Sequence, residues 1–364
     1  MAEVRSRERI DIEQAALGPT HGQFVDPEHR RERTRIGQGA HAGATSQRRR
    51  NRVGGTIDHQ IGGQTKNHLR TNAHVPMMPK GCDSAFYASV MTTYTWWVDG
   101  EMVSSDEATL PVADHGLTVG DGCFETTAIV RGAAFAMTRH LARLRNSLAG
   151  LLIDLPTTDT ELRAATDAVV AANPGAGIIR ITVTAGTGPL GSGRGEGTPT
   201  VIVAAGPNRG WGDRAGVVTV PWPRNERGAL AGIKSTSYAE NVIALARAKA
   251  VGASEAIFPN TIGNLCEGTG TNIFVEHEGR LVTPPVSSGC LAGVTRGLVV
   301  ETSAVAEVDV PIEILETTSE AFLTSSTRDV MAIDRIDDRT LEAGPLTAAA
   351  AAAFAELAAS TIDP

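Results

Sequence analysis

The segment 230–241, LAGIKSTSYAEN, contains a lysine whose position could support catalysis. Ser237 and Glu240 have the S-x-x-E spacing of a capping box, which predicts a helix that begins at about Tyr238. Lys234 would then lie on the turn just before a helix N-terminus, where the helix dipole disfavours a cation. Burial and a nearby positive dipole both lower the pKa of a lysine, and the neutral amine is a nucleophile. On this pattern alone, an ordinary surface lysine remains the favoured interpretation.

A glycine-rich motif, GTGPLG at 186–191, follows an expected strand and matches the G-x-G-x-x-G pattern of dinucleotide sites. Such a site requires a helix directly after the loop, because the helix N-terminus holds the pyrophosphate. The continuation here is SGRGEGTP, whose glycines and proline do not favour a helix. We therefore expect a mobile loop near a ligand and no dinucleotide site.

Several other short motifs lie on both sides of Lys234. Upstream are 114–126 (DHGLTVGDGCFET) and 140–144 (HLARL), and downstream are 264–274 (NLCEGTGTNIF) and 289–297 (GCLAGVTRG). In order and spacing, from about residue 97 to about residue 333, they resemble the class IV aminotransferases, the fold-type IV pyridoxal-phosphate enzymes. The family includes branched-chain aminotransferases, D-amino-acid aminotransferases and 4-amino-4-deoxychorismate lyases. The resemblance implies a two-domain α+β / α/β enzyme that uses pyridoxal 5'-phosphate.

The resemblance also implies roles for single residues. Lys234 matches the lysine that holds the cofactor covalently and acts as general base on the substrate carbon that bears nitrogen. Glu267 matches the carboxylate that keeps the pyridine nitrogen protonated, so that the ring can accept electrons. The other implied cofactor contacts are Arg143 on the phosphate, Val294 and Thr295 at a phosphate-binding helix N-terminus, Leu291 on the ring face, Ser326 at a phosphate or substrate-carboxylate position, and Tyr238 and Asn272 beside the cofactor.

The reaction itself stays open at this level. The run GDGCF within 114–126 resembles the lyases and D-amino-acid enzymes, and it favours 4-amino-4-deoxychorismate lyase, which releases pyruvate and 4-aminobenzoate for folate synthesis. The alternative is an aminotransferase acting on branched-chain or D-amino acids with a 2-oxo acid acceptor. A catalytically dead binding protein of the same fold is disfavoured, because the lysine, the glutamate and the phosphate-site residues are all present. Arg180 and Arg194 are the candidates for holding a substrate carboxylate.

The elements that must position these residues follow from hydrophobic periodicity and turn signals. Strands are predicted at 94–98, 123–130, 133–137, 178–184, 200–205, 216–222, 255–258, 272–276, 280–283, 320–325 and 330–333, and helices at 140–152, 159–172, 238–250, 295–305 and 347–359. Three glycines and a proline at 206–213 predict a linker. It would join a small N-terminal α+β domain, 92–205, to a larger cofactor-binding domain, 214–364.

Residues 1–91 differ from the rest of the chain in charge and pattern. They carry 14 Lys and Arg against 9 Asp and Glu, whereas residues 92–364 carry 19 against 32. Because residues 1–76 have no helical or strand periodicity, we expect a disordered basic extension. It would be an over-extended start, since Met77, Met78 and Met91 could each begin the folded protein. Its dense cluster of arginines, 48–52, contains no aromatic residue to stack on bases, so we expect no nucleic-acid partner.

Composition excludes other classes of protein. No apolar run approaches the roughly 18–20 residues of a membrane span, and the first residues lack the apolar core of a signal peptide. The four cysteines are scattered without metal-binding spacing, which fits reduced thiols in a cytoplasm and no metal site. The expected partners are a small-molecule amine substrate and, from the family resemblance, a second copy of the chain in a homodimer.

Overall fold

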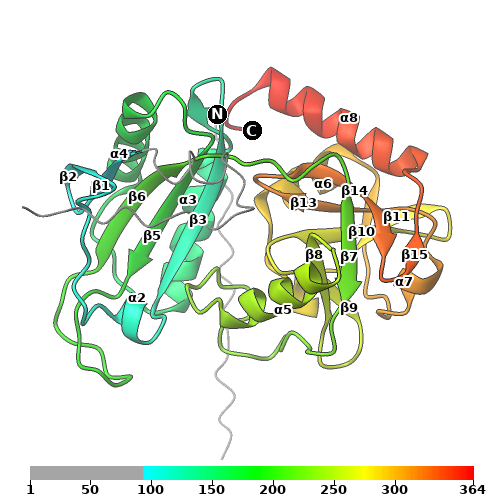
Figure 1. The fold of residues 1–364 in the computed structure, drawn as a ribbon, viewed down its shortest axis with the longest axis horizontal. Helices are drawn as coiled ribbons and strands as arrows, with labels where there is room; N and C mark the ends of the chain where they lie inside the picture. Colours follow the sequence, from blue (N-terminus) through cyan, green and yellow to red (C-terminus); the bar gives the residue numbers. More distant parts are fainter. Residues whose placement is uncertain (1–92) are drawn as a thin grey trace, which may run out of the picture. The chain divides into compact units, whose positions relative to one another are not determined.

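The computed structural model describes residues 93–364. The predicted extension, with its arginine cluster and its alternative starts, lies outside the described residues. The described chain forms two sheets with helices packed against them (Figure 1). This agrees with the mixed α and β class expected from the sequence.

The first sheet has six strands in the order β2-β1-β6-β5-β3-β4, and all neighbours are antiparallel. Its strands are β1 (Thr95–Val98), β2 (Glu101–Ser104), β3 (Gly122–Val130), β4 (Ala133–Ala134), β5 (Ile178–Thr184) and β6 (Thr200–Gly206). Asp99-Gly100 and Arg131-Gly132 form the turns of the β1–β2 and β3–β4 hairpins, and all four residues have positive φ. The predicted strand 133–137 is wrong in length, since the backbone enters a helix at Met137.

Two helices, α3 (Met137–Gly150) and α4 (Asp159–Ala172), bury their apolar sides against this sheet in one core. Leu141, Leu144 and Leu148 lie on the buried face of α3, which starts three residues earlier than the predicted helix 140–152 and ends before Leu151. Thr158 caps α4 through a capping box with Glu161, which explains why the predicted bounds of this helix hold. A short helix, α2 (His115–Thr118), was not predicted.

The second sheet is mixed and has nine strands, ordered β12-β11-β10-β13-β14-β7-β8-β9 with β15 beside β14. Its strands are β7 (Ala215–Thr219), β8 (Glu255–Pro259), β9 (Leu265–Gly268), β10 (Asn272–His277), β11 (Arg280–Thr283), β12 (Val305–Glu307), β13 (Ala321–Ser325), β14 (Asp329–Ile336) and β15 (Arg339–Thr340). Strand β9 was missed because it is short and its glycines and polar neighbours do not alternate. It carries Glu267, whose backbone is thereby fixed beside β8.

The remaining helices surround the second sheet: α5 (Ala239–Ala250), η1 (Val286–Ser288), α6 (Val294–Thr302), α7 (Ile314–Thr317) and α8 (Pro345–Ser360). Figure 1 shows α8 along the outer side of the sheet, where it packs on α6 and β14. After α8 the chain returns to α3. The amide of Ala136 donates to the carbonyl of Ile362 at 2.8 Å, and Thr138 donates to Asp363 at 2.6 Å. The C-terminal tail therefore ties the second half of the chain to the first.

The connection between the sheets runs through residues 207–214, since β6 ends at Gly206 and β7 begins at Ala215. It is held by Trp211, whose indole N–H donates to the Thr327 hydroxyl at 3.2 Å. The guanidinium of Arg328 lies 3.8 Å from the centre of a Trp211 ring, a cation–π contact. The division into domains at 206–213 stays a prediction.

A buried ion pair holds two of the loops between the strands of the second sheet. Glu255 and Arg328 are both almost fully buried, with 3.3 Å between carboxylate and guanidinium. The same carboxylate accepts hydrogen bonds from the amide and hydroxyl of Thr269 and from the hydroxyl of Thr271. Burying two charges is costly, and it is tolerated here because each has several partners. The loop 269–271 is thereby fixed relative to 325–328.

We predict that Arg328→Met lowers the free energy of unfolding by about 3–5 kcal/mol, because Glu255 keeps a buried charge without its cation. The measurement is urea unfolding of the cofactor-free protein. The control is Arg280→Met, which removes the same group from an exposed pair with Glu278 at 3.7 Å and should change stability little. Equal stability losses in the two variants would contradict the structural role of the buried pair.

Candidate active site

A pocket of about 960 Å³ lies where loops from the two halves of the chain meet. Its walls come from 116–126, 224–241, 267–272, 289–296 and 324–327, with single residues from α3 and β5. The structure brings ten of the predicted site residues to this lining: Arg143, Arg180, Lys234, Tyr238, Glu267, Asn272, Leu291, Val294, Thr295 and Ser326. Arg194 is outside the lining.

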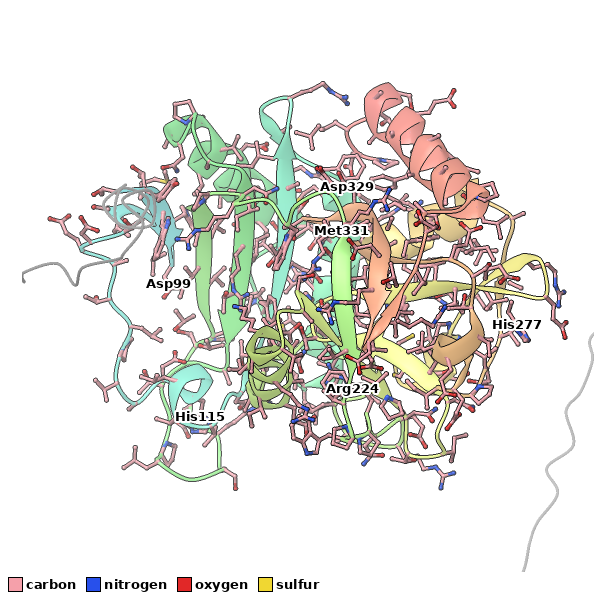
Figure 2. The ribbon with its side chains drawn as sticks, turned by 45° about the vertical axis from the view of Figure 1, so that its right-hand side comes forward. Asp99, His115, Arg224, His277, Asp329 and Met331 are labelled. Atoms are coloured by element: carbon pink, nitrogen blue, oxygen red, sulfur yellow. The ribbon has the colours of Figure 1, made fainter. Side chains whose placement is uncertain are left out.

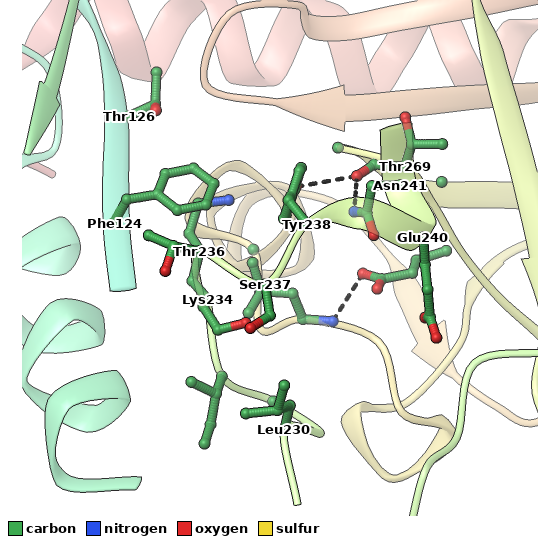
Figure 3. Close-up of a pocket in the computed structure, with 18 of the residues that line it drawn as sticks. Phe124, Thr126, Leu230, Lys234, Thr236, Ser237, Tyr238, Glu240, Asn241 and Thr269 are labelled. Atoms are coloured by element: carbon green, nitrogen blue, oxygen red, sulfur yellow. Dashed lines mark hydrogen bonds between the residues drawn. The ribbon is translucent and has the colours of Figure 1, made fainter. Parts of the chain in front are cut away.

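Lys234 enters the pocket from a segment that is hydrogen-bonded to β3. The amide of Phe124 donates to the carbonyl of Lys234 at 3.0 Å, and the amide of Thr236 donates to the carbonyl of Gly122 at 2.8 Å. These bonds continue the edge of β3 for a few residues. The Lys234 ammonium nitrogen lies 4.5 Å from the centre of the Phe124 ring (Figure 3).

The predicted capping box is wrong. Helix α5 begins at Ala239 with Tyr238 as its N-cap, and no side chain caps its N-terminus. The hydroxyl of Ser237 instead donates to the carbonyl of Gly120 at 3.0 Å, which binds the segment to the loop before β3. Tertiary hydrogen bonding has replaced the local cap. Lys234 still precedes the helix, as predicted.

The environment of Lys234 favours the neutral amine. Burial, followed by the charge of Arg143, lowers the pKa of Lys234 to about 8, although Glu125 and Glu267 oppose the shift. The fraction of unprotonated amine near neutral pH is therefore far larger than at an ordinary lysine, and this amine can act as a nucleophile or a base. This is the property that the sequence suggested, produced mainly by burial.

Glu267 lies on the other side of the pocket from β3, on strand β9. Its carboxylate accepts the amide of Leu291 at 2.9 Å and lies 3.2 Å from Nε of Arg224. Burial raises the pKa of Glu267, while Arg224 and the Leu291 amide favour its ionised form. A carboxylate held in this way can pair with a protonated ring nitrogen.

The sequence reasoning missed Arg224, which follows β7 (Figure 2). Its guanidinium donates to the Asn241 side chain at 2.8 Å and lies 4.1 Å from the centre of the Phe258 ring. It therefore holds a fixed position beside Glu267. The only local signal was an arginine in the proline-rich run PWPRNE, which gives no indication of a partner far along the chain.

The opposite end of the pocket collects donors suited to an anion. Helix α6 begins at Val294 after Gly293 and has no side-chain cap, so its first N–H groups are available. Arg143 and Ser326 also line this region. The hydroxyl of Thr324 is buried and has no hydrogen-bond partner among residues 93–364. An orphan hydroxyl, an uncapped helix N-terminus and a cation together fit a phosphate group.

Arg143 is held by two buried residues that the sequence reasoning did not single out. Its guanidinium donates to both carboxylate oxygens of Glu125, at 2.8 and 2.6 Å, and to the carbonyl of Ala292 at 3.1 Å. His140 contacts the same carboxylate at 2.7 Å. The i, i+3 spacing of His140 and Arg143 on α3 was a visible signal, since it puts both on one helix face.

Asn272 shapes the turn before α6. Its side-chain amide donates to the carbonyl of Leu291 at 2.9 Å. A Cβ on Gly293 would lie 2.0 Å from the Asn272 oxygen, so a larger residue there would displace the Asn272 side chain. Asn272 thus orients Leu291 and the helix N-terminus through the turn.

Tyr238 and Arg180 border the part of the pocket near Phe124. The Tyr238 hydroxyl donates to the carbonyl of Thr269 at 3.0 Å, and its ring meets that of Phe124 edge to face. The Arg180 guanidinium lies 3.6 Å from the centre of the same Phe124 ring. Both side chains therefore flank the region reached by Lys234.

Arg194 forms its hydrogen bonds with groups of the protein that do not line the pocket. It donates twice to Asp121, at 2.7 and 2.6 Å, and it also donates to the carbonyls of Leu151 and Leu152 after α3. It lies in the loop that contains GTGPLG, and no helix follows that motif directly. His115 of α2 (Figure 2) anchors that loop by a 2.8 Å hydrogen bond to the carbonyl of Pro189.

No helix among residues 93–364 is long and apolar enough to cross a membrane. Within the same residues, no group of three or more histidine, cysteine, aspartate or glutamate side chains could hold a metal ion.

Comparison with known proteins connects this chain to one family. The sequence pattern described as "Amino-transferase class IV" matches residues 122–336. A putative branched-chain-amino-acid aminotransferase of Methanocaldococcus jannaschii is 32% identical over 255 residues, covering 67% of this chain and 88% of that protein. A D-alanine aminotransferase of Bacillus licheniformis is 30% identical over 265 residues, covering 68% and 92%.

The fold agrees with these matches. The solved structure of a branched-chain aminotransferase from Thermoproteus uzoniensis, with norvaline, superposes with a TM-score of 0.69 at 28% identity, covering 73% of this chain and 95% of that one. An aminodeoxychorismate lyase of Bacillus subtilis is 26% identical over 254 residues, covering 66% and 86%. The chain belongs to the class IV aminotransferase family, whose members are pyridoxal-phosphate enzymes.

Proposed function

We propose that this enzyme transfers an amino group between an amino acid and a 2-oxo acid. The observation that carries the proposal is that two basic side chains lie against the same aromatic ring, one that can lose its proton and one that stays charged. Lys234, which loses its proton readily, lies 4.5 Å from the centre of the Phe124 ring, and Arg180, which stays charged, lies 3.6 Å from it. A substrate carboxylate on Arg180 would bring the adjacent carbon within the region that Lys234 reaches.

The cofactor contacts are proposed from the geometry of the pocket. Lys234 would hold the cofactor covalently, and Glu267 would face its ring nitrogen. Arg143, Ser326 and the N-terminus of α6 would hold its phosphate. When bound, pyridoxal phosphate supplies an electron sink for the carbon that loses a proton. The protein then contributes the base, Lys234, and the carboxylate that keeps the ring nitrogen protonated.

Arg180 is the better of the two predicted carboxylate ligands. It lines the pocket, and its Nε donates one hydrogen bond, to the Thr182 hydroxyl at 3.3 Å. Arg194 already donates to Asp121 and to two backbone carbonyls outside the pocket. We propose no substrate role for Arg194.

The lyase reaction favoured by the GDGCF run remains the alternative. Three curated relatives that are at least 30% identical carry aminotransferase names, whereas the lyase is 26% identical. This difference supports amino-group transfer as the first function to test. The homodimer expected from the family resemblance also remains a proposal.

The decisive assay compares the two reactions in the same purified enzyme. We expect amino-group transfer from members of a panel of L- and D-amino acids to a 2-oxo acid, and no release of pyruvate from aminodeoxychorismate. Arg180→Gln should raise KM for the amino acid by about 10–100-fold, the equivalent of one charged hydrogen bond.

Arg194→Gln is the matched control for that variant, and it should leave KM for the amino acid unchanged. Turnover of aminodeoxychorismate with no amino-group transfer would replace the proposed function by the lyase. Equal KM changes in the two arginine variants would remove Arg180 as the carboxylate ligand.

The lowered pKa of Lys234 predicts how cofactor attachment depends on pH. Only the neutral amine reacts, so the rate should rise with pH and level off above about 8, the pKa of Lys234. The rate is measured from the visible absorbance that appears when pyridoxal phosphate is added to cofactor-free enzyme. With Nα-acetyl-lysine under the same conditions, the rate of reaction should keep rising with pH up to the ordinary pKa of a lysine amine, near 10.4.

Borohydride should abolish the visible band and fix the cofactor at Lys234, where peptide mass analysis would find it. Lys234→Ala should show neither the band nor the fixed cofactor. If that variant keeps both, the assignment of Lys234 is wrong.

Glu267→Gln should separate cofactor binding from catalysis. The amide preserves the shape and one hydrogen bond but removes the charge that supports a protonated ring nitrogen. We expect the cofactor to bind and turnover to fall by about 100-fold or more, as when electrostatic support is lost at other reacting centres. Glu278→Gln, the same change on an exposed turn, is the control. Near wild-type turnover of Glu267→Gln with cofactor bound would exclude Glu267 as the ring partner.

A further inference from the structure

A buried chain of polar groups connects two residues at the anion end of the pocket. The Ser326 hydroxyl lies 3.3 Å from Nε2 of His140, and Nδ1 of His140 lies 2.7 Å from Glu125. Glu125 in turn accepts two hydrogen bonds from Arg143. The side chains of His140 and Glu125 are only 1% and 2% exposed. Ser326 and Arg143 are therefore joined through groups that water does not reach.

The hydrogen on one nitrogen of His140 is fixed by this arrangement. Burial would raise the pKa of Glu125, but Arg143 and His140 together outweigh burial and hold that pKa at about 2. The carboxylate is therefore ionised and can only accept hydrogen bonds. Nδ1 of His140 must carry a hydrogen that points to Glu125. The variable position is Nε2, which faces Ser326.

The state of Nε2 decides what Ser326 offers to the pocket. A hydroxyl has one hydrogen to donate. If Nε2 is unprotonated, Ser326 donates its hydrogen to the ring and presents lone pairs to a ligand. If Nε2 is protonated, the ring donates to Ser326, and the hydroxyl hydrogen is free for a phosphate oxygen. Only the second arrangement makes Ser326 a donor to an anion.

Burial opposes the protonation of His140, and two nearby cations add to this effect. Burial lowers the pKa of His140, Glu125 on β3 raises it, and Arg143 on α3 and Lys234 from the segment before α5 lower it. Ser326, after β13, is the uncharged group that faces Nε2. A phosphate beside Ser326 and Arg143 would counter both cations and attract the proton to the ring.

We propose that phosphate capture in this pocket is coupled to the uptake of one proton from solvent at Nε2 of His140, which turns Ser326 into a donor. Glu125 and His140 are then positioning residues, Glu125 fixing the ring and the guanidinium together. This inference rests on the proposed assignment of Arg143 and Ser326 to the cofactor phosphate. By linkage, the affinity for a phosphate should fall by up to tenfold per pH unit over the range in which His140 protonates only in the complex.

The direct test is nitrogen-15 NMR of histidine-labelled enzyme at pH 8, with the His140 signals assigned by their loss in His140→Gln. Pyridoxal phosphate and pyridoxal form a matched pair, because they differ only in the phosphate. We expect Nε2 to be unprotonated in the cofactor-free enzyme and with pyridoxal, and protonated with pyridoxal phosphate. Adding sulfate to the pyridoxal complex should also protonate it. The same Nε2 state in all four samples would overturn the proposal.

Sulfate affinity between pH 6.5 and 9 provides a second measurement, because sulfate does not itself titrate in this range. In the cofactor-free enzyme, the affinity should fall with pH more steeply in wild type than in His140→Gln. Lys234 is present in both proteins, so its titration contributes equally to the two slopes of sulfate affinity against pH. His115→Gln is the control, since His115 is also buried near a carboxylate, 3.5 Å from Asp121, and it should keep the wild-type slope.

Two outcomes distinguish a failure of the proton coupling from a failure of the proposed phosphate site at Arg143 and Ser326. If neither Arg143→Gln nor Ser326→Ala weakens sulfate binding, the anion is held elsewhere, and the assignment and the coupling are both overturned. If these variants weaken binding but His140→Gln keeps the wild-type slope, the phosphate site stands and only the coupling is overturned.

Discussion

The hydrogen bonding of residues 234–236 to β3 is the constraint on which the site depends. Phe124 and Lys234 share one backbone bond, and Thr236 and Gly122 share another. These bonds place a residue from the second half of the chain against a strand of the first sheet. The pocket exists because both halves contribute walls at this junction. A lysine on a free loop would sample many positions and remain solvated, with an ordinary pKa.

The charges of the pocket are arranged in separated groups, each with its own partner. Glu267 is paired with Arg224 at one end, and Arg143 is paired with Glu125 at the other. Lys234 experiences the charges of Arg143 and Arg180 and of both carboxylates. Because burial is the largest influence on its pKa, the effect comes from the shape of the fold more than from any single neighbour. Glu267 and Arg143 are therefore available to orient a ligand that carries a ring nitrogen and a phosphate.

Support for the site comes from buried polar groups that do not line the pocket. Glu255 binds the loop 269–271, and that loop accepts the hydroxyl of Tyr238 and the amide of Asn241 at the carbonyl of Thr269. Asn241 also binds Arg224, the partner of Glu267. Figure 3 shows the contacts of Tyr238 and Asn241 with Thr269. One buried carboxylate thus indirectly restrains the tyrosine and the arginine of the site, since each bond leaves the next group fewer positions.

The sequence by itself determined most of the elements and which residues could do chemistry. Hairpin turns at Asp99 and Arg131, the leucine face of α3 and the capped start of α4 are local features, and local physics predicts them. The family motifs similarly placed Lys234 and Glu267 in one site. Tertiary structure decided the rest, because the deciding partners are far apart in sequence. The hydroxyl of Ser237 binds Gly120, so the capping box does not form. Arg224 acquires its role from Glu267, and Glu125 from Arg143 and His140. The same physical reason separates Arg180 from Arg194: each is an arginine without a local motif, and only the folded chain puts one in the pocket and the other on Asp121.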